Sequence, residues 1–301
     1  MEYRADRYMA HLSPSALKQR FLDVLSNTVE LLDSGQLGLA QAPADPAFWM
    51  SRFTHLHEEF TLRQTGLPAF PSLGPDAPKC LPRPTHPNPP PSVAIWKTLP
   101  TRGDALFKYG QHQNLKKVST EGTIRLNPAS SYEDPSLNPA VRDAELTFTY
   151  QVRPSPLTGR FTDPLNGTTL LIPPGQGFKY TVSTDDYLVF CCAAARSNRL
   201  YQDFRADACL VITDPSRFVK EAAKAGEADL PGYSFGYAGL RYVDPLIATP
   251  NGRPVHAIKH FRFAYQKEFR CIWQPKPGAP RLEPVDLRMP HLRDYSVLVA
   301  L

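Results

Sequence analysis

The chain of 301 residues lacks several features that would place it in a familiar class at once. No apolar run approaches the roughly 18 residues needed to cross a bilayer, so we expect no membrane-spanning helix. The five cysteines never form a C-x-x-C pair, and an odd number in mostly apolar stretches favours reduced, buried thiols. The first residues lack the apolar core of a signal peptide. We therefore expect a cytoplasmic protein without a metal site.

The common catalytic motifs are missing as well. The sequence has no G-x-S-x-G elbow, no P-loop and no dinucleotide-binding G-x-G-x-x-G. Cys191 and Cys192 lie in a run apolar enough to raise the pKa of a thiol, which favours an inert role over a nucleophilic one. No cluster of Asp, Glu and His suggests a nuclease. The formal charge of +5 fits a nucleotide or nucleic acid partner without selecting either.

Residues 1–67 predict a helical hairpin that extends the main domain. Ser13 and Asp45 are typical N-caps, and each is followed at once by a proline, which suits the first helical position. Apolar residues then recur at helical spacing in both segments. Gly35 and Gly66 follow as stop signals.

A proline-rich stretch over residues 68–93 separates this hairpin from the rest. Ten of the 32 prolines lie between residues 68 and 91. Proline removes backbone donors and blocks helix continuation, so we expect a linker or an extended strap.

Residues 94–301 predict a single α+β domain with a split, mainly antiparallel sheet, because short strands outnumber helices in an irregular order. The patterns predict a hairpin from the two segments around the Pro-Gly turn at residues 174–175. Helices are expected over residues 113–121 and, from the Asp214 cap to a stop at Gly226, over residues 215–225. Strands are expected over residues 104–110, 123–128, 144–152, 168–174, 177–183, 186–195, 206–213, 235–244 and 261–273.

The last of these strands, FRFAYQKEFRCIW, alternates in a way that could matter for function. Side chains of a strand point to opposite faces in turn, so Gln266, Glu268 and Arg270 share one face and the aromatic residues the other. One interpretation is a half-buried strand with a solvated polar face. The other places Gln266 and Glu268 on the wall of a cleft.

Several stretches, taken in order, resemble ADP-ribosyltransferases, including bacterial toxins that modify nucleic acids. They are LFKYGQHQNLKKVSTEGTIRLNP, SSYEDPSLN, YLVFCCAAARSNRLYQDF and QKEFR, which together span roughly residues 104–274. The strand LVFCCAAA departs from the family in having neither serine nor threonine, which leaves the subclass open. The resemblance implies an ADP-ribosyltransferase-like fold for residues 94–301.

For the chemistry, the resemblance implies a catalytic glutamate on a late strand, preceded two residues earlier by Gln or Glu. Glu268 and Gln266 match this pattern. Glu268 would stabilise the positive charge that develops on the ribose as the bond to nicotinamide breaks. Gln266 would orient the acceptor.

Five further residues are candidates for binding NAD. Each also has an ordinary structural role: the tyrosines can pack in the core, the cations can lie at the surface, and Asn114 can cap the helix that starts at residue 115. Tyrosine rings can hold nicotinamide or its ribose, and the cations can hold pyrophosphate oxygens. The candidates are Lys108, Tyr109, Asn114, Arg125 and Tyr201.

The sequence therefore predicts an NAD-dependent ADP-ribosyltransferase that acts on RNA, DNA or protein. The resemblance implies a bacterial toxin, effector or anti-phage protein, with an antitoxin or immunity partner and, for a toxin, delivery into a target cell. The alternative is a non-catalytic module that binds a nucleotide or nucleic acid.

Overall fold

The computed structural model describes residues 2–34, 36–40, 46–69, 102–153, 159–173, 176–279 and 282–300. The proline-rich stretch predicted over residues 68–93 therefore lies almost entirely outside the described residues, as do Cys80 and the predicted cap Asp45.

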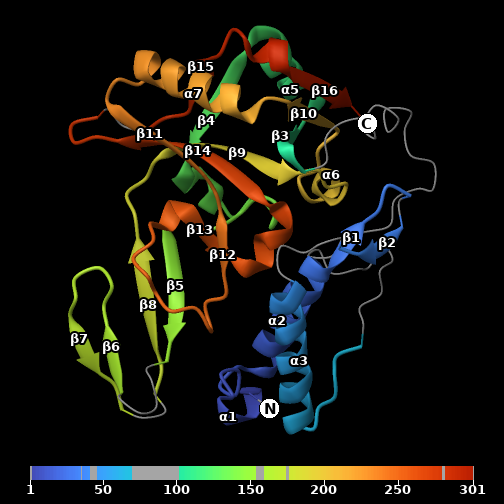
Figure 1. Cartoon of the computed structure of the whole chain (residues 1–301), viewed down its shortest axis with the longest axis vertical. Coiled ribbons are helices and arrows are strands. Elements are labelled where there is room, and N and C mark those ends of the chain that lie inside the picture. Colours follow the sequence, from blue (N-terminus) through green and yellow to red (C-terminus); the bar gives the residue numbers. More distant parts are fainter. Residues whose placement is uncertain are drawn as a thin grey trace.

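Short strands connected by a few helices make up the described chain (Figure 1). The helices are α1 (Glu2–Ala5), α2 (Pro14–Thr28), α3 (Pro46–Leu62), α5 (His112–Glu121), α6 (Arg199–Asp203) and α7 (Pro215–Asp229), with 3-10 turns η1 (Ala129–Glu133), η2 (Val255–Ala257), η3 (Phe261–Gln266) and η4 (Leu292–Tyr295). The strands are β1 (Val29–Leu31), β2 (Leu37–Leu39), β3 (Arg102–Gly110), β4 (Thr123–Pro128), β5 (Thr147–Val152), β6 (Arg160–Thr162), β7 (Thr169–Leu171), β8 (Phe178–Ser183), β9 (Leu188–Ala195), β10 (Ala208–Ile212), β11 (Tyr233–Gly239), β12 (Arg241–Val243), β13 (Ile258–His260), β14 (Glu268–Pro275), β15 (Val285–Arg288) and β16 (Ser296–Ala300). Within the described ranges, none of the helices combines the length and apolar character needed to cross a membrane.

An antiparallel sheet in the order β11-β14-β9-β3-β10-β16 forms the centre of the molecule, and β4 and β15 extend it from β9. Only the short pair β12–β13 is parallel among the described strands. The predicted α+β class with mainly antiparallel strands is thus confirmed. This order places the early strand β3 and the late strand β14 on either side of β9.

The two faces of the sheet have separate cores. On one face, Leu115 of α5 and Phe218 of α7 pack against buried strand residues such as Leu210. On the other, Leu200 of α6 packs on a smaller apolar cluster that includes Phe107. Because helices cover both faces, β9 and β10 are apolar almost throughout, as their sequences predict.

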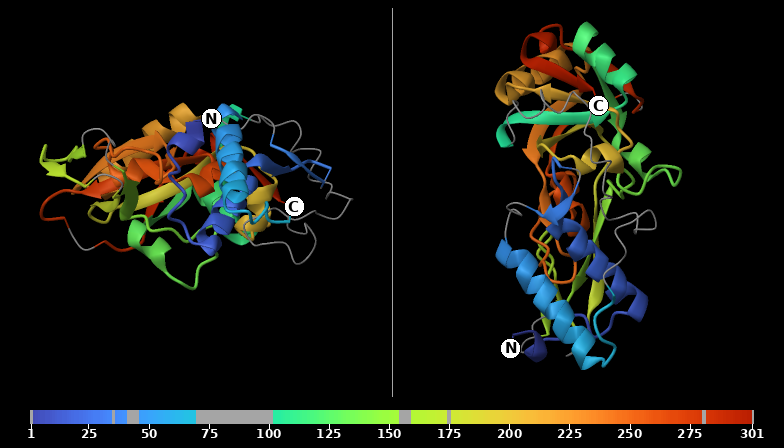
Figure 2. Two further views of the ribbon diagram at one scale, coloured as in Figure 1. Left: turned by 90° about the horizontal axis from the view of Figure 1, so that it is seen from below. Right: turned by 90° about the vertical axis from the view of Figure 1, so that its right-hand side faces the viewer.

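The N-terminal helices pack against one end of this domain, as the side view in Figure 2 shows. Their apolar core includes two residues from far along the chain, Leu246 and Phe261. Arg20 of α2 donates two hydrogen bonds to the buried carboxylate of Asp244, at 3.0 and 2.5 Å. The hairpin therefore shares a core and a buried ion pair with the rest of the protein.

The predicted start of α2 is confirmed, but its predicted end is wrong. The Ser13 hydroxyl accepts a hydrogen bond from the amide of Ala16, at 3.2 Å, and Pro14 is the first helical residue. The helix ends at Thr28, before Gly35, because the next three residues pair with β2. The β-branched Val29 leaves the helix with extended backbone angles.

The predicted hairpin around residues 174–175 is also wrong. Strand β7 pairs with β6, and β8 pairs with β5. Gly167, with φ of 74°, allows the tight turn that connects β6 to β7. Phe148 of β5 and Val182 of β8 meet in register and join an apolar cluster of their own.

The strand predicted over residues 261–273 forms only in its second half. Residues 261–266 are the 3-10 turn η3, and β14 begins at Glu268. The amide of Tyr265 donates to the side-chain oxygen of Asn27 at 2.7 Å, so a contact with α2 holds the turn. Lys267 joins the turn to the strand with φ of 46° in the left-handed region, which is rare for a residue with a side chain.

Gly226 lies inside α7, so its predicted role as a stop signal is wrong. A Cβ atom at this position would lie 2.1 Å from Nε1 of Trp273, whose ring is fully buried on β14. The glycine therefore allows the helix to pack closely on the sheet.

Replacing Gly226 with alanine is expected to destabilise the fold by up to about 2 kcal/mol. Overpacking typically costs about 1–3 kcal/mol, and the better helix propensity of alanine returns about 1 kcal/mol at most. The midpoint of chemical denaturation measures the change. An unchanged or higher midpoint would show that the Trp273 ring can move aside.

Candidate active site

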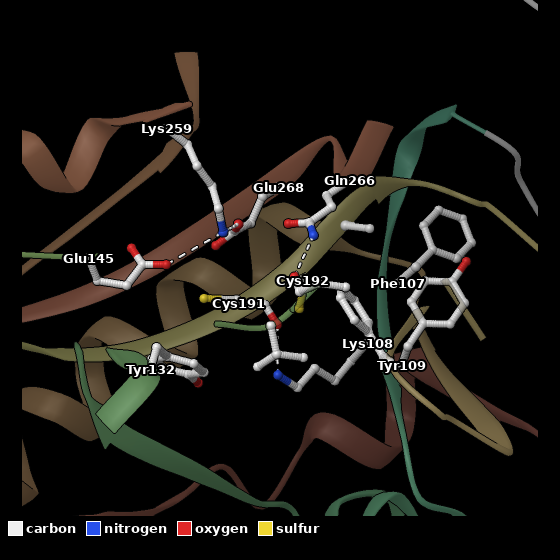
Figure 3. Close-up of a pocket in the computed structure, with 14 residues that line it drawn as sticks. Phe107, Lys108, Tyr109, Tyr132, Glu145, Cys191, Cys192, Lys259, Gln266 and Glu268 are labelled. Carbon is white, nitrogen blue, oxygen red and sulfur yellow. Dashed lines mark hydrogen bonds and ion pairs between the residues drawn. The ribbon is translucent and has the colours of Figure 1, made fainter. Parts of the chain in front are cut away.

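Two cavities share the residue Glu268 in their walls. Cavity 1, of about 230 Å³, lies against β3, β9 and the start of β14. Cavity 2, of about 530 Å³, lies between the N-terminal helices and residues 261–268. Figure 3 shows the side chains that line cavity 1.

The local chain path explains why Glu268 is buried. The left-handed Lys267 ends the 3-10 turn, and Glu268 then pairs with Ala193 on β9, the neighbouring central strand. Its amide donates a hydrogen bond of 2.7 Å to the hydroxyl of Tyr242. Only 8% of Glu268 is exposed. The solvated polar strand face considered from the sequence is therefore absent here.

Two cations hold the carboxylate of Glu268. Arg270 donates from Nε at 2.6 Å to Oε1, and Lys259 donates from Nζ at 2.9 Å to Oε2. Burial alone would raise the pKa of Glu268, but the charges of Arg270 and Lys259 outweigh it and hold this pKa well below its usual range. Glu268 is thus ionised at neutral pH.

A second carboxylate completes this buried network. Glu145 accepts a hydrogen bond of 2.8 Å from Arg270 and lies 3.4 Å from Nζ of Lys259. Glu145, Glu268 and Lys259 lie in the wall of cavity 1 (Figure 3), and Asp143 lies 3.8 Å from Lys259 and from Arg262 at the edge of the network. The fixed orientation of Glu268 follows from these contacts.

Gln266 lines cavity 1 beside Glu268, although it belongs to η3 and not to the strand. Its Nε2 donates to the carbonyl of Ala140 at 2.7 Å, and only 4% of the residue is exposed. Gln266 and Glu268 thus lie side by side at one cavity, as predicted. The 3-10 turn brings them together, and the alternation of a strand does not.

Lys108 and Tyr109 reach the same cavity from β3. Nζ of Lys108 donates to the carbonyl of Cys191 at 2.9 Å and lies 4.6 Å from the ring centre of Phe190. The hydroxyl of Tyr109 accepts from the amide of Ser197 at 2.8 Å. The first strand and the late glutamate, about 160 residues apart in the sequence, therefore meet at one cavity.

Tyr201 lies outside the walls of both cavities and packs behind Tyr109. The two rings meet edge to face with their centres 5.0 Å apart. Burial raises the pKa of Tyr201, so its hydroxyl stays protonated. Its contact with a ligand in cavity 1 would be indirect, through the ring of Tyr109.

The structure places Asn114 and Arg125 away from both cavities. The cap of α5 is Gln111, and the amide of His112 donates to the carboxylate of Asp207, so the helix begins earlier than predicted. The capping role predicted for Asn114 is therefore wrong. Arg125 is exposed on β4 and lies 3.3 Å from a carboxylate oxygen of Asp286 on β15, which suits a surface cation.

Sequence reasoning did not find Lys259 and Glu145. Both are charged residues next to apolar or aromatic neighbours, which is a weak signal for burial. Burial raises the pKa of Cys192 to about 12, the direction expected from its apolar strand, and both cysteines of β9 lie in the wall of cavity 1. Within the described ranges, no group of His, Cys, Asp and Glu has the arrangement of a metal site.

Comparison with known proteins gives no family for this chain. No protein-family profile, curated protein sequence or solved structure matches it. The site must therefore be interpreted from its own geometry.

Proposed function

We propose that the protein transfers ADP-ribose from NAD to a macromolecule and that cavity 1 holds the reactive end of NAD. The observation that supports this most is the meeting of Glu268 and Gln266 with Lys108 and Tyr109 at one cavity. These are the residues for which the sequence resembles ADP-ribosyltransferases. The central sheet that brings them together has the mainly antiparallel α+β character that the proposal requires.

The state of Glu268 suits the proposed chemistry. The departing nicotinamide takes the bonding electron pair and leaves positive charge on the ribose, which an ionised carboxylate nearby stabilises. A carboxylate has about four lone-pair sites, and Arg270 and Lys259 occupy two of those on Glu268. The remaining sites can accept a hydrogen bond from a ribose hydroxyl.

The other residues of cavity 1 fit the same substrate. Tyr109 and the nearby aromatic side chains offer flat surfaces for the nicotinamide ring, and Gln266 can orient a nucleophile without adding charge. Ligand pockets usually have about 300–1,000 Å³. At about 230 Å³, cavity 1 would enclose the nicotinamide and its ribose, with the remainder of NAD outside it.

One observation favours a second candidate function, the binding of a nucleotide without turnover. Both oxygens of Glu268 already accept a short hydrogen bond from a cation, which reduces the field that a ribosyl cation would experience. A site of this kind could recognise a nucleotide and leave the glycosidic bond intact.

Incubation of the purified protein with NAD tests the proposal. We expect release of free nicotinamide, measured by chromatography, with slow hydrolysis when no acceptor is present. Saturable binding of NAD without any nicotinamide release would support the binding module. Absence of both binding and release would contradict both functions.

A further inference from the structure

Cavity 2 is more than twice as large as cavity 1, and residues of the N-terminal region form part of its wall. One of its walls comes from the N-terminal helical region and the other from β12 and residues 261–268. Contacts such as the hydrogen bond from Tyr265 to Asn27 fix the two walls relative to each other. The appended helices thus help to build a site beside the candidate active site.

Aromatic rings line much of this cavity. Phe48 and Trp49 of α3 meet edge to face at 4.9 Å, and Phe261 lies 6.0 Å from Trp49. On the opposite side, the guanidinium of Arg199 lies 3.4 Å from the ring centre of Tyr265. Flat rings and stacked guanidinium groups are the surfaces on which proteins stack unpaired bases.

A cation at the cavity wall complements these rings. Arg241 on β12 is exposed, and no carboxylate of the described residues forms an ion pair with it. Arg20 and Arg199, by contrast, are each engaged by an aspartate. An exposed arginine with no such partner, next to aromatic rings, is suited to a phosphate group.

Glu268 connects cavity 2 to the proposed chemistry, because this residue lies in the walls of both cavities. A group held in cavity 2 would therefore approach the ribose held in cavity 1. The net charge of +5 favours an anionic ligand.

We propose that cavity 2 is the acceptor site and takes one unstacked base of a single-stranded nucleic acid, with an adjacent phosphate on Arg241. The transfer step rests on the proposed function, but the binding of the strand does not. In that step the bond from ribose to nicotinamide breaks and its electron pair leaves with nicotinamide. An N–H nitrogen of the base bonds to the ribose carbon, and the proton of that N–H passes to water.

Phe48 gives the sharpest test of binding. Replacing it with alanine removes one stacking surface and should weaken the binding of a short single-stranded oligonucleotide about 5- to 150-fold. Met50 lies two residues further along α3, is 67% exposed and is outside cavity 2, so Met50→Ala is the matched control and should bind normally. Fluorescence anisotropy of a labelled strand without NAD measures the affinity, and a thermal melt checks folding.

Arg241 gives a second test with a different readout. Arg241→Ala should reduce the slope of log K against log salt concentration by about 0.7, the value for one phosphate contact on a single strand. Arg253→Ala, which removes an exposed arginine outside the cavity, should leave the slope unchanged.

Each outcome decides a separate question. Equal affinity of wild type and Phe48→Ala, tighter binding of duplex than of single strand, or the same Phe48 dependence for a peptide would overturn the nucleic acid assignment. If NAD and the strand compete for binding and Phe48→Ala weakens the binding of NAD, cavity 2 would hold the adenine of NAD. That result would also overturn the nucleic acid assignment. Strand binding through Phe48 and Arg241 in a protein that never releases nicotinamide would support this site and contradict the proposed enzyme.

Discussion

Replacing Glu268 with glutamine is expected to lower the rate of nicotinamide release by on the order of 100- to 1000-fold. The substitution keeps the shape of the side chain and removes only the charge that would stabilise the ribosyl cation. The same substitution also disturbs the fold, because it removes the carboxylate that binds both Lys259 and Arg270 and leaves them with Glu145 and, for Lys259, Asp143 at 3.8 Å. Breaking a buried ion pair from one side costs about 3–5 kcal/mol.

Asp244→Asn is a matched control for this disturbance. Asp244 is also a buried carboxylate held by two cations, Arg20 and Arg52, but it lines neither cavity. Both variants should therefore lose stability, while only Glu268→Gln should lose turnover per folded molecule. Thermal melts measure the loss of stability, and rates of nicotinamide release well below the melting temperature measure the loss of turnover. A folded Glu268→Gln protein with wild-type turnover would refute the catalytic assignment.

Local chemistry allowed several helix ends and strands to be predicted from the sequence. The Ser13 cap, the left-handed Gly122 after α5, and the alternation of Phe269, Cys271 and Trp273 all depend on residues within one turn or strand. Their physical causes act over a few residues, so they are visible without knowledge of the fold.

The errors arose where distant residues determine the local structure. Residues 261–266 have the alternation of a strand, but Asn27 of α2 accepts a hydrogen bond from the Tyr265 amide and donates one to the carbonyl of Arg262. Gly226 looks like a stop signal because the sequence does not show that the Trp273 ring lies against it.

The candidate site shows the same limit. Glu268 and Gln266 could be chosen from their spacing and the family resemblance. Lys259, which with Arg270 keeps Glu268 ionised, and Glu145, which binds both cations, come from separate segments. Their roles depend on three-dimensional proximity, which neither composition nor periodicity reports.

Deletion of residues 1–92 is expected to abolish the cooperative folding of the remaining chain. The deletion would expose Leu246 and Phe261, which the N-terminal helices now cover, and would leave the buried carboxylate of Asp244 without Arg20 and Arg52. Burial of a Leu or Phe side chain contributes about 1.5–3 kcal/mol, so exposing these two residues and losing the ion pair removes a large part of a typical stability of about 5–15 kcal/mol.

Circular dichroism and thermal melts of the truncated protein measure this effect. Adding Asp244→Asn to the truncated protein should have little effect, because Arg20 and Arg52 are already absent, whereas in the full-length protein it breaks an ion pair and destabilises. This loss of the effect is specific to a shared buried ion pair. A truncated protein that melts cooperatively at the temperature of the full-length protein would show instead that the helices are an independent module. Cavity 2 would then lose one wall without loss of the fold, and strand binding could be measured with and without the helices.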